Sequence, residues 1–264
     1  MNSVWGRVCV VTGSARGLGR AIAAALGAAG GRLALCDILT DELEQTAADL
    51  RAAGCEVFAA PCDVSDSASV DAFFASVEQA LGPVEVLVNN AALVPGGPQD
   101  EVRRNRHYAY LTTPEPRTSL GFTSAMSDDD WLRYWGVNVH GVFFCTRAAL
   151  RQMEPRAFGR IVNIASIAGL STYSAHSPHY SATKGAVIAF TRSVAAEVAG
   201  ANIFVNAIAP GGVATPMFDR YLASLDAEAR GRLFQIIPAG RLGTMDEYAG
   251  LVLYLAGDGH YLAG

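Results

Sequence analysis

The sequence lacks the features of a membrane protein and of a nucleic-acid-binding protein. No apolar run approaches the ~18 residues that a helix needs to cross a bilayer. Charged residues make up only 17% of the 264 residues, the net charge is −5, and there is no basic block. The N-terminal residues do not have the layout of a signal peptide. We therefore expect a cytoplasmic protein that binds neither nucleic acid nor membrane.

Cysteine and histidine are scarce and are not arranged as metal ligands. The five cysteines form no CxxC pair and have no metal-type spacing with the five histidines. Most of the cysteines lie in apolar, strand-like segments, where the side chain acts as a small hydrophobic group. We expect reduced thiols and no metal site.

Hydrophobic residues, by contrast, are abundant at 51%, which is ample for a large core. Strand-like and helix-like segments alternate along the chain, without a linker or an internal repeat. This pattern predicts an α/β protein with a single Rossmann-type domain over 1–264, in which a doubly wound parallel sheet carries helices on both faces. The expected strands are 7–12, 33–37, 55–60, 84–89, 159–165 and 202–208.

A glycine-rich turn joins the first strand to the first helix. It contains Gly13, Gly17 and Gly19, which permit a tight turn and a close approach of the backbone to a ligand. Since the amino end of a helix attracts anions, the turn is typical of a phosphate cradle. The GxxxGxG spacing differs from the GxGxxG of the standard dinucleotide fingerprint, and the alternative is a plain tight turn.

The second expected strand ends in Asp37. An acid about 20 residues beyond such a turn can accept hydrogen bonds from the adenosine ribose and repels a 2′-phosphate. Asp37 thus favours NAD, whereas Arg16 in the turn leaves NADP possible. Asp37 could also cap the following helix.

Tyr180 and Lys184 are four residues apart, so on a helix they share one face. Ser177 as N-cap and Pro178 as the first helical residue predict that such a helix starts just before them. A neighbouring ammonium is expected to lower the pKa of the phenol and make it useful for proton transfer. The alternative is a surface helix that carries both residues by chance.

The segment 93–126 breaks the alternation of strands and helices. It holds four prolines and little periodicity, and it follows the carboxyl end of a strand, where open α/β sheets bind ligands. We expect a long irregular loop over the substrate, or else a solvated or oligomer-facing loop. A second lid is expected at 213–238, with short amphipathic helices in 216–237. The insertion residues that could face a substrate are Arg103, Arg104, Arg106, His107, Tyr108 and Tyr110.

Together these segments resemble the classical short-chain dehydrogenases/reductases over nearly the whole chain. The matching motifs occur in the order of that family. They are Thr12-Gly13-xxx-Gly17-x-Gly19, Asp63-Val64, Asn89-Asn90-Ala91-Ala92, Asn138, Ser166, Tyr180-xxx-Lys184 and Pro210-Gly211-xxx-Thr215-x-Met217.

The resemblance implies NAD(P)-dependent oxidation of alcohols or reduction of carbonyls, and assigns four catalytic residues. Tyr180 would be the acid/base, and Lys184 would lower its pKa and hold the nicotinamide ribose. Ser166 would bind the substrate oxygen, and Asn138 would hold a water that relays protons. The residues that would line the cofactor, besides Tyr180 and Lys184, are Gly13, Arg16, Gly17, Leu18, Gly19, Asp37, Asp63, Val64, Asn89, Ala91, Pro210, Gly211, Val213 and Thr215.

The chain departs from the family pattern in four places. Ala92 replaces a usual Gly, the Ser166–Tyr180 gap is one residue longer, and the insertion 93–126 is unusually long. The sequence also ends at Gly264, before the further strand that usually follows in the family and packs between subunits, so either the given chain omits a tail or the protein lacks that strand. Without it, the edge of the sixth strand is expected to be bare. The resemblance implies a homotetramer or a homodimer. A bare edge would weigh against the homotetramer.

Three classes of function compete. The first is an NAD(H)-dependent secondary-alcohol dehydrogenase or ketoreductase, acting on a bulky or aromatic substrate or on a 3-oxoacyl thioester of CoA or of acyl carrier protein. The second is a non-catalytic nucleotide-binding protein with the same fold. The third is a lyase, epimerase or dehalogenase that reuses the site. The presence of both Tyr180 and Lys184 favours the first.

Overall fold

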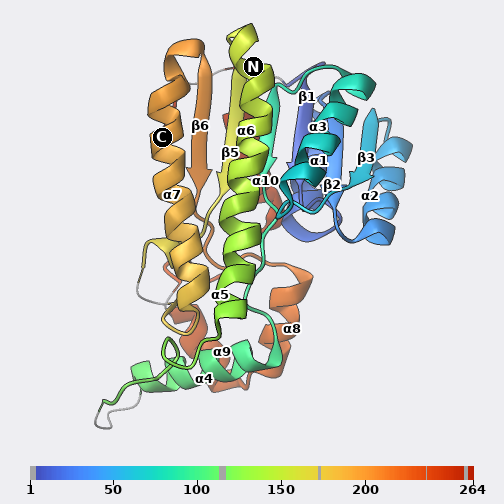
Figure 1. The fold of residues 1–264 in the computed structure, drawn as a ribbon. Coiled ribbons are helices and arrows are strands. Elements are labelled where there is room, and N and C mark those ends of the chain that lie inside the picture. The colour runs from blue at the N-terminus through green and yellow to red at the C-terminus, as the bar shows by residue number, and fades with distance from the viewer. Residues whose placement is uncertain (1–3, 113–116, 172–173, 236, 259–260) are drawn as a thin grey trace.

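Six parallel strands form the sheet of the computed structural model, in the spatial order β3-β2-β1-β4-β5-β6 (Figure 1). The structure describes residues 4–112, 117–171, 174–235, 237–258 and 261–264. Residues 113–116 of the expected insertion, 172–173 before Tyr180 and 236 of the expected lid lie outside these ranges. The strands are β1 Val8–Thr12, β2 Arg32–Asp37, β3 Val57–Pro61, β4 Val86–Asn89, β5 Gly159–Ile164 and β6 Ile203–Ile208.

The strand order indicates where on the sheet a ligand is expected to bind. The chain winds outward from β1 to β3 and then crosses back, so that β4 lies on the other side of β1. Ligands of open parallel sheets bind at the carboxyl ends of the strands beside this reversal. The doubly wound parallel sheet predicted from the sequence is therefore confirmed. The ends of its six strands differ from the expected ends by at most two residues.

Helices cover both faces of the sheet (Figure 1). One face packs against α1, α2 and α10, and the other against α3, α6 and α7. The helices are α1 Gly17–Ala28, α2 Thr40–Ala52, α3 Ser67–Leu81, α4 Pro98–Thr112, α5 Asp128–Trp135, α6 Gly141–Met153, α7 Pro178–Val198, α8 Pro216–Ser224, α9 Ala227–Gln235 and α10 Met245–Ala256. Among the described residues, no helix is both long and apolar enough to cross a membrane.

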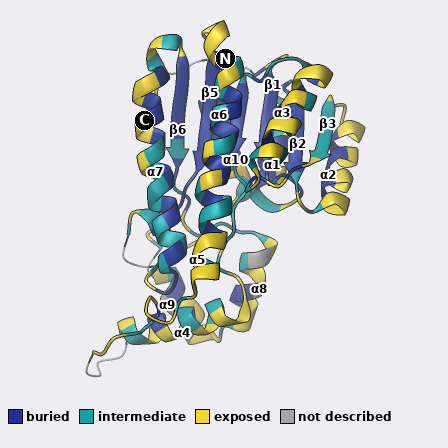
Figure 2. Cartoon of the chain, in the orientation of Figure 1, coloured by how far each residue is buried: buried dark blue, intermediate teal, exposed yellow. Residues whose placement is uncertain are grey.

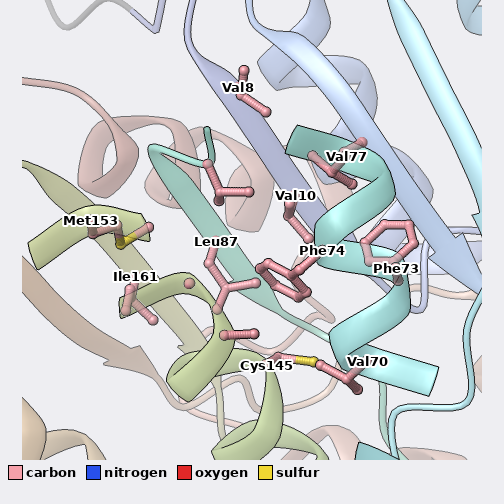
Figure 3. Close-up of a cluster of buried hydrophobic side chains, with 14 of the residues drawn as sticks. Val8, Val10, Val70, Phe73, Phe74, Val77, Leu87, Cys145, Met153 and Ile161 are labelled. Carbon is pink, nitrogen blue, oxygen red and sulfur yellow. The ribbon is translucent and has the colours of Figure 1, made fainter. Parts of the chain in front are cut away.

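The sheet is buried on both faces, which is why its strands are almost uninterrupted apolar runs (Figure 2). On the α3 side, Phe74 and Leu87 pack with Met153 and Ile161 in a continuous cluster (Figure 3). Burying each such side chain contributes ~1.5–3 kcal/mol. The core thus provides a rigid support for the residues that follow the carboxyl ends of the strands.

Side chains cap two helix starts, and a third start lacks such a cap. The Asp66 carboxylate caps α3 by accepting a hydrogen bond from the Ala68 amide at 2.9 Å. Thr244 and Glu247 form a capping box at the start of α10. Ser177 occupies the N-cap position of α7 as predicted, but its side chain makes no capping bond. Its buried hydroxyl has no hydrogen-bond partner among the described residues.

The expectation of an irregular loop over 93–126 is wrong for part of its length, because the segment contains the helix α4. The Asp100 carboxylate accepts hydrogen bonds from the amides of Gly96 and Gly97 and so supports the amino end of α4. The helix escaped a pattern search because it has no apolar stripe and packs through aromatic and guanidinium groups instead. The one or two short amphipathic helices expected in 216–237 are present as α8 and α9.

The edge of β6 is not bare. The Gly264 amide donates to the Val205 carbonyl, and the Asn206 side chain donates to the Leu262 carbonyl, both at 2.9 Å. The aromatic ring of Tyr261 packs edge-on against Phe204. The expectation of an uncovered edge was wrong, because the residues 261–264 lie along β6 and satisfy part of its hydrogen bonding.

Candidate active site

A cavity of about 600 Å³ lies at the carboxyl ends of the central strands. Its floor is formed by residues that follow β4, β5 and β6 and by the start of α7, and its roof is formed by α4, α8 and α9. Figure 1 shows these three helices beyond the strand ends, away from the main body of the sheet. The predicted site residues that line the cavity are Leu18, Ser166, Tyr180, Lys184, Pro210, Gly211, Val213 and Thr215.

The glycine turn has the geometry of an anion cradle. Gly13 and Gly17 have positive φ angles of 65° and 57°, which residues with side chains rarely adopt. A Cβ on Gly19 would collide with the Gly13 carbonyl, whereas a Cβ on Gly17 would meet open space. Arg16, the N-cap residue of α1, makes no capping hydrogen bond through its side chain. The first amide groups of α1 are therefore free for an anion, and these residues fit the pyrophosphate of a dinucleotide.

Asn90 fixes this turn, and sequence reasoning gave it no role. Its side-chain amide donates to the carbonyls of Thr12 and Gly13, at 3.0 and 2.9 Å. The backbone amides of Asn90 and Ala91 in turn donate to the Thr12 hydroxyl. Asn89, which the resemblance assigned to the cofactor, is buried, and its side-chain amide donates to Asn163 and Thr146. In the sequence, the only signal for these two structural roles was the pair Asn89-Asn90 at the end of the fourth expected strand.

Asp37 is the last residue of β2 and lies beside the glycine turn. Its carboxylate accepts hydrogen bonds from the Ala15 amide at 3.0 Å and from the Leu39 amide at 3.1 Å. It therefore braces both the glycine turn and the entry to α2. Arg16 forms an exposed ion pair with Glu42 at 3.3 Å. Arg16 and Asp37, together with Gly13, Gly17, Gly19, Asp63, Val64, Asn89 and Ala91, are not among the residues that line the cavity.

Ser166 and Tyr180 face one another in the cavity. The Ser166 hydroxyl oxygen accepts a hydrogen bond from the Ala168 amide at 3.1 Å, which leaves its proton to be donated. Burial raises the pKa of Tyr180, and a hydrogen bond with Ser166 opposes that shift. Lys184 does not contribute to the pKa shift of Tyr180 in the protein alone, contrary to the expectation from the sequence.

Lys184 is buried and makes a short contact of its own. Its ammonium donates to the Ile164 carbonyl at 2.7 Å and lies 5.8 Å from the centre of the Tyr180 ring. Burial lowers the pKa of Lys184 to about 8. Lys184 is also the only lysine in the sequence. A residue count alone could have singled it out, because every other basic side chain apart from the histidines is arginine.

Asn138 lies in a π-helical segment, Gly136–His140, between α5 and α6. Segments of this kind are frequent at functional sites. The buried side chain accepts a hydrogen bond from the Leu93 amide at 2.7 Å and donates to the Leu93 carbonyl at 3.0 Å. It also donates to Thr183, one residue before Lys184. Asn138 therefore ties the start of the insertion to α7.

Only two of the six insertion residues that were expected to face a substrate line the cavity, namely Arg104 and Tyr108. His107 is buried against His176 instead. Glu101, Ser224 and His176 also line the cavity. Sequence reasoning missed Glu101 because α4 has no periodic signal, and it missed Ser224 and His176 because their approach to the cavity depends on long-range packing. The other three insertion residues make local contacts: Arg103 with Asp100, Arg106 with Phe122 and Tyr110 with Arg117.

The chain was compared with known proteins. The family model described as short chain dehydrogenase matches residues 7–225. The 2-(R)-hydroxypropyl-CoM dehydrogenase of Xanthobacter autotrophicus is 36% identical, over 98% of this chain and 94% of its own. The 3-oxoacyl-[acyl-carrier-protein] reductase MabA of Mycobacterium bovis is 33% identical, over 98% of this chain and 89% of its own. A variant of actinorhodin polyketide ketoreductase, solved with NADPH, superposes with a TM-score of 0.81 at 35% identity, over 96% of this chain and 91% of that one.

Proposed function

This chain belongs to the short-chain dehydrogenase family, and from that premise we propose that it transfers a hydride between NAD(H) and a ketone or secondary alcohol. Membership of the family makes it an oxidoreductase related to ketoacyl reductases. The observation that carries the proposal is the meeting of Ser166, Tyr180 and Lys184 in one cavity beside an uncapped α1.

The cofactor would supply or accept the hydride, and the side chains would manage the oxygen and its proton. Ser166 and Tyr180 would both donate hydrogen bonds to the carbonyl oxygen, which places the carbonyl carbon. During reduction Tyr180 would give its proton to this oxygen, and during oxidation it would take that proton back. A raised pKa in the protein alone suits the first of these roles, because the phenol stays protonated.

Lys184 would hold the ribose of the nicotinamide and favour the phenolate once Tyr180 has given up its proton. Its pKa of about 8 means that the ammonium can release a proton near neutral pH. Asn138, linked to Lys184 through Thr183, would keep the catalytic helix and the insertion in register. Tyr180 and Lys184 would thus hold or move a proton, and Asn138 would position the helix that carries them.

We propose NAD as the preferred cofactor because Asp37 braces the turn where an adenosine ribose would lie. A carboxylate there accepts hydrogen bonds from ribose hydroxyls and repels a 2′-phosphate. Arg16 is the residue that would favour NADP, and its exposed pair with Glu42 is weak enough to be exchanged. The actinorhodin relative was solved with NADPH, so NADP is the alternative.

The roof of the cavity favours a bulky or aromatic substrate. Tyr108, Phe218 and Tyr221 line it together with Leu233 and Ile237, and large apolar side chains at such a site bind an apolar body. The second candidate is a 3-oxoacyl thioester, which the printed name of the MabA relative supports. Both substrate classes present a carbonyl to the same pair of hydroxyl groups.

The test is turnover of a panel of ketones and secondary alcohols with NAD(H) and NADP(H), followed through the absorbance of the reduced nicotinamide. The substitution Tyr180→Phe should reduce the rate by a factor on the order of 10²–10⁴, the range for loss of a general acid. Tyr254→Phe, a change on an exposed tyrosine of α10, is the matched control. Equal activity of Tyr180→Phe and the wild type on the best substrate would overturn the role of Tyr180.

A further inference from the structure

Arg104 projects from α4 into the roof of the cavity without a carboxylate partner among the described ion pairs. Its guanidinium donates one hydrogen bond to the Pro95 carbonyl at 2.9 Å and lies 4.3 Å from the centre of the Tyr221 ring. These two contacts hold the group in place but use few of its five N–H donors. A held guanidinium with unused donors is the usual receptor for a planar oxoanion.

Nearby acids are engaged elsewhere. Asp100 binds the amides of Gly96 and Gly97 and faces Arg103. Glu101 accepts a hydrogen bond from the Ser224 hydroxyl at 3.0 Å, a contact that joins α4 to α8. The cavity therefore keeps Arg104 available to a ligand.

Tyr221 adds a second observation. It is only 9% exposed and lines the cavity, and its hydroxyl makes no hydrogen bond of good geometry with a described residue. Burial raises the pKa of this phenol, whereas the Arg104 charge and a side-chain hydrogen bond with Arg104 oppose that rise. Since a guanidinium only donates, the proton of the Tyr221 hydroxyl still lacks an acceptor. Buried polar groups normally have a partner, which here would be a ligand atom.

The charge balance of the cavity points the same way. Arg104, Arg220 and Lys184 are the cationic residues that line it, and Glu101 is its one carboxylate among the described residues. Arg104 also lowers the pKa of His176, after the larger effect of burial. Since His176 is four residues before Tyr180, the guanidinium acts on the same end of the catalytic helix as the reacting groups.

We infer that Arg104 and Tyr221 form a subsite for a carboxylate, and that the substrate is an oxo acid or hydroxy acid with an apolar body between its two polar ends. Ser166 and Tyr180 bind the carbonyl oxygen of the substrate. Phe218 and Leu233 contact its apolar body, and its carboxylate binds to Arg104 and Tyr221. This inference rests on the proposed function, because it names the substrate class of the same cavity.

The first test compares each oxo acid of a series of increasing chain length with its own methyl ester. The wild type should prefer the acid by about 10- to 100-fold in kcat/KM, the range of a charge-assisted hydrogen bond. Arg104→Met should remove this preference through KM, Arg104→Lys should retain part of it, and Tyr221→Phe should reduce it by a smaller factor. Arg103→Met, on the same helix but outside the cavity, should keep the wild-type ratio. An acid-to-ester ratio near one in the wild type, or one that Arg104→Met leaves intact, overturns the inference.

The second test needs no turnover. Binding of phenylbutyrate, of its methyl ester and of phenyl phosphate is measured by calorimetry on wild type, Arg104→Met and Tyr221→Phe. Tighter binding of phenylbutyrate than of the ester, lost in Arg104→Met, supports the subsite even if every ketone proves inert, in which case only the proposed reaction fails. Equal binding of acid and ester overturns the subsite, and tighter binding of phenyl phosphate overturns its assignment to a carboxylate.

Discussion

His107 on α4 and His176 before α7 hold their Nδ1 atoms 3.3 Å apart in a buried contact. Two ring nitrogens can share one hydrogen bond only if one ring donates and the other accepts, so the accepting ring must be neutral. The contact fastens the roof of the cavity to the segment that leads into the catalytic helix. Its strength must therefore depend on pH.

We predict that the protein loses stability as the pH falls from about 6.5 towards about 3. Burial lowers the pKa of His176 from 6.5 to about 3, with Arg104, His107 and His179 adding to that shift. Burial also lowers the pKa of His107. The unfolded chain then binds more protons than the folded one in this window, so acid favours unfolding. Chemical unfolding at a series of pH values measures the effect.

The substitution His176→Gln should flatten this dependence, whereas His140→Gln, on an exposed ring, should leave it unchanged. If the free energy of unfolding of His176→Gln follows the same slope as the wild type between these pH values, then the histidine contact does not set the acid response.

Lys184 should titrate with a pKa of about 8, well below the usual 10.5, because it is buried. As it is the only lysine, protein labelled with ¹³C at the lysine ε-carbon gives a single side-chain resonance whose shift reports this pKa by NMR. The Lys184→Arg variant, which lacks the resonance, confirms the assignment. A midpoint near 10.5 would mean that the ammonium is solvated and would remove its link to proton transfer near neutral pH.

Gly169→Ala should damage both stability and activity. An added Cβ would lie 2.6 Å from the Gly185 amide nitrogen and 2.7 Å from the Lys184 carbonyl carbon, and the backbone of α7 would have to move. Overpacking of this kind costs ~1–3 kcal/mol, and a displaced catalytic helix should lower kcat by about 10- to 100-fold. Thermal unfolding and steady-state rates measure the two effects.

The matched control is Gly185→Ala on the opposite side of the same contact. Its Cβ would lie 3.6 Å from the Gly169 carbonyl oxygen, an ordinary van der Waals distance. Alanine inside a helix is favoured over glycine by roughly 0.5–1 kcal/mol, so this variant should be as stable as the wild type or more so. Equal losses in both variants would contradict the steric explanation.

Asp37→Ser should shift the cofactor preference from NAD towards NADP, since it removes the charge that would oppose a 2′-phosphate. The ratio of the dissociation constants for NADH and NADPH, measured by nicotinamide fluorescence, should change by about 10-fold or more. Asp71→Ser, which removes an exposed carboxylate of α3 that pairs with Arg151 and has no assigned role in cofactor binding, is the control. A wild type that already binds NADPH more tightly would refute the preference and direct attention to Arg16.

The sequence was most informative where backbone geometry and burial leave few choices. The β1 strand, the glycine turn and the start of α7 were all predicted correctly, because a buried parallel strand, a positive φ and a proline at the first helical position each leave a clear residue pattern. The spacing of Tyr180 and Lys184 on α7 was predicted in the same way.

It was least informative where long-range contacts decide the structure. The helix α4 is polar, so its pattern did not distinguish it from a loop, and its contacts with His176 and Tyr221 come from distant segments. Asn89 and Asn90 are adjacent in the sequence, yet their side chains donate to different partners, Asn163 and the Gly13 carbonyl. The sequence does not show which side of the sheet each side chain faces. The pKa of Tyr180 likewise follows from how deeply α7 is buried, and spacing alone does not contain that information.

The insertion is fixed at both ends. Asn138 binds both backbone groups of Leu93 on one side, and the Ser127 hydroxyl caps α5 on the other. Since doubling the length of a flexible loop costs only ~0.6 kcal/mol, we expect segments of other lengths and charges to be tolerated between these two anchors if the contact of His107 with His176 is kept. Grafting such segments between Leu93 and Ser127 offers a route to change the substrate range of the proposed active site.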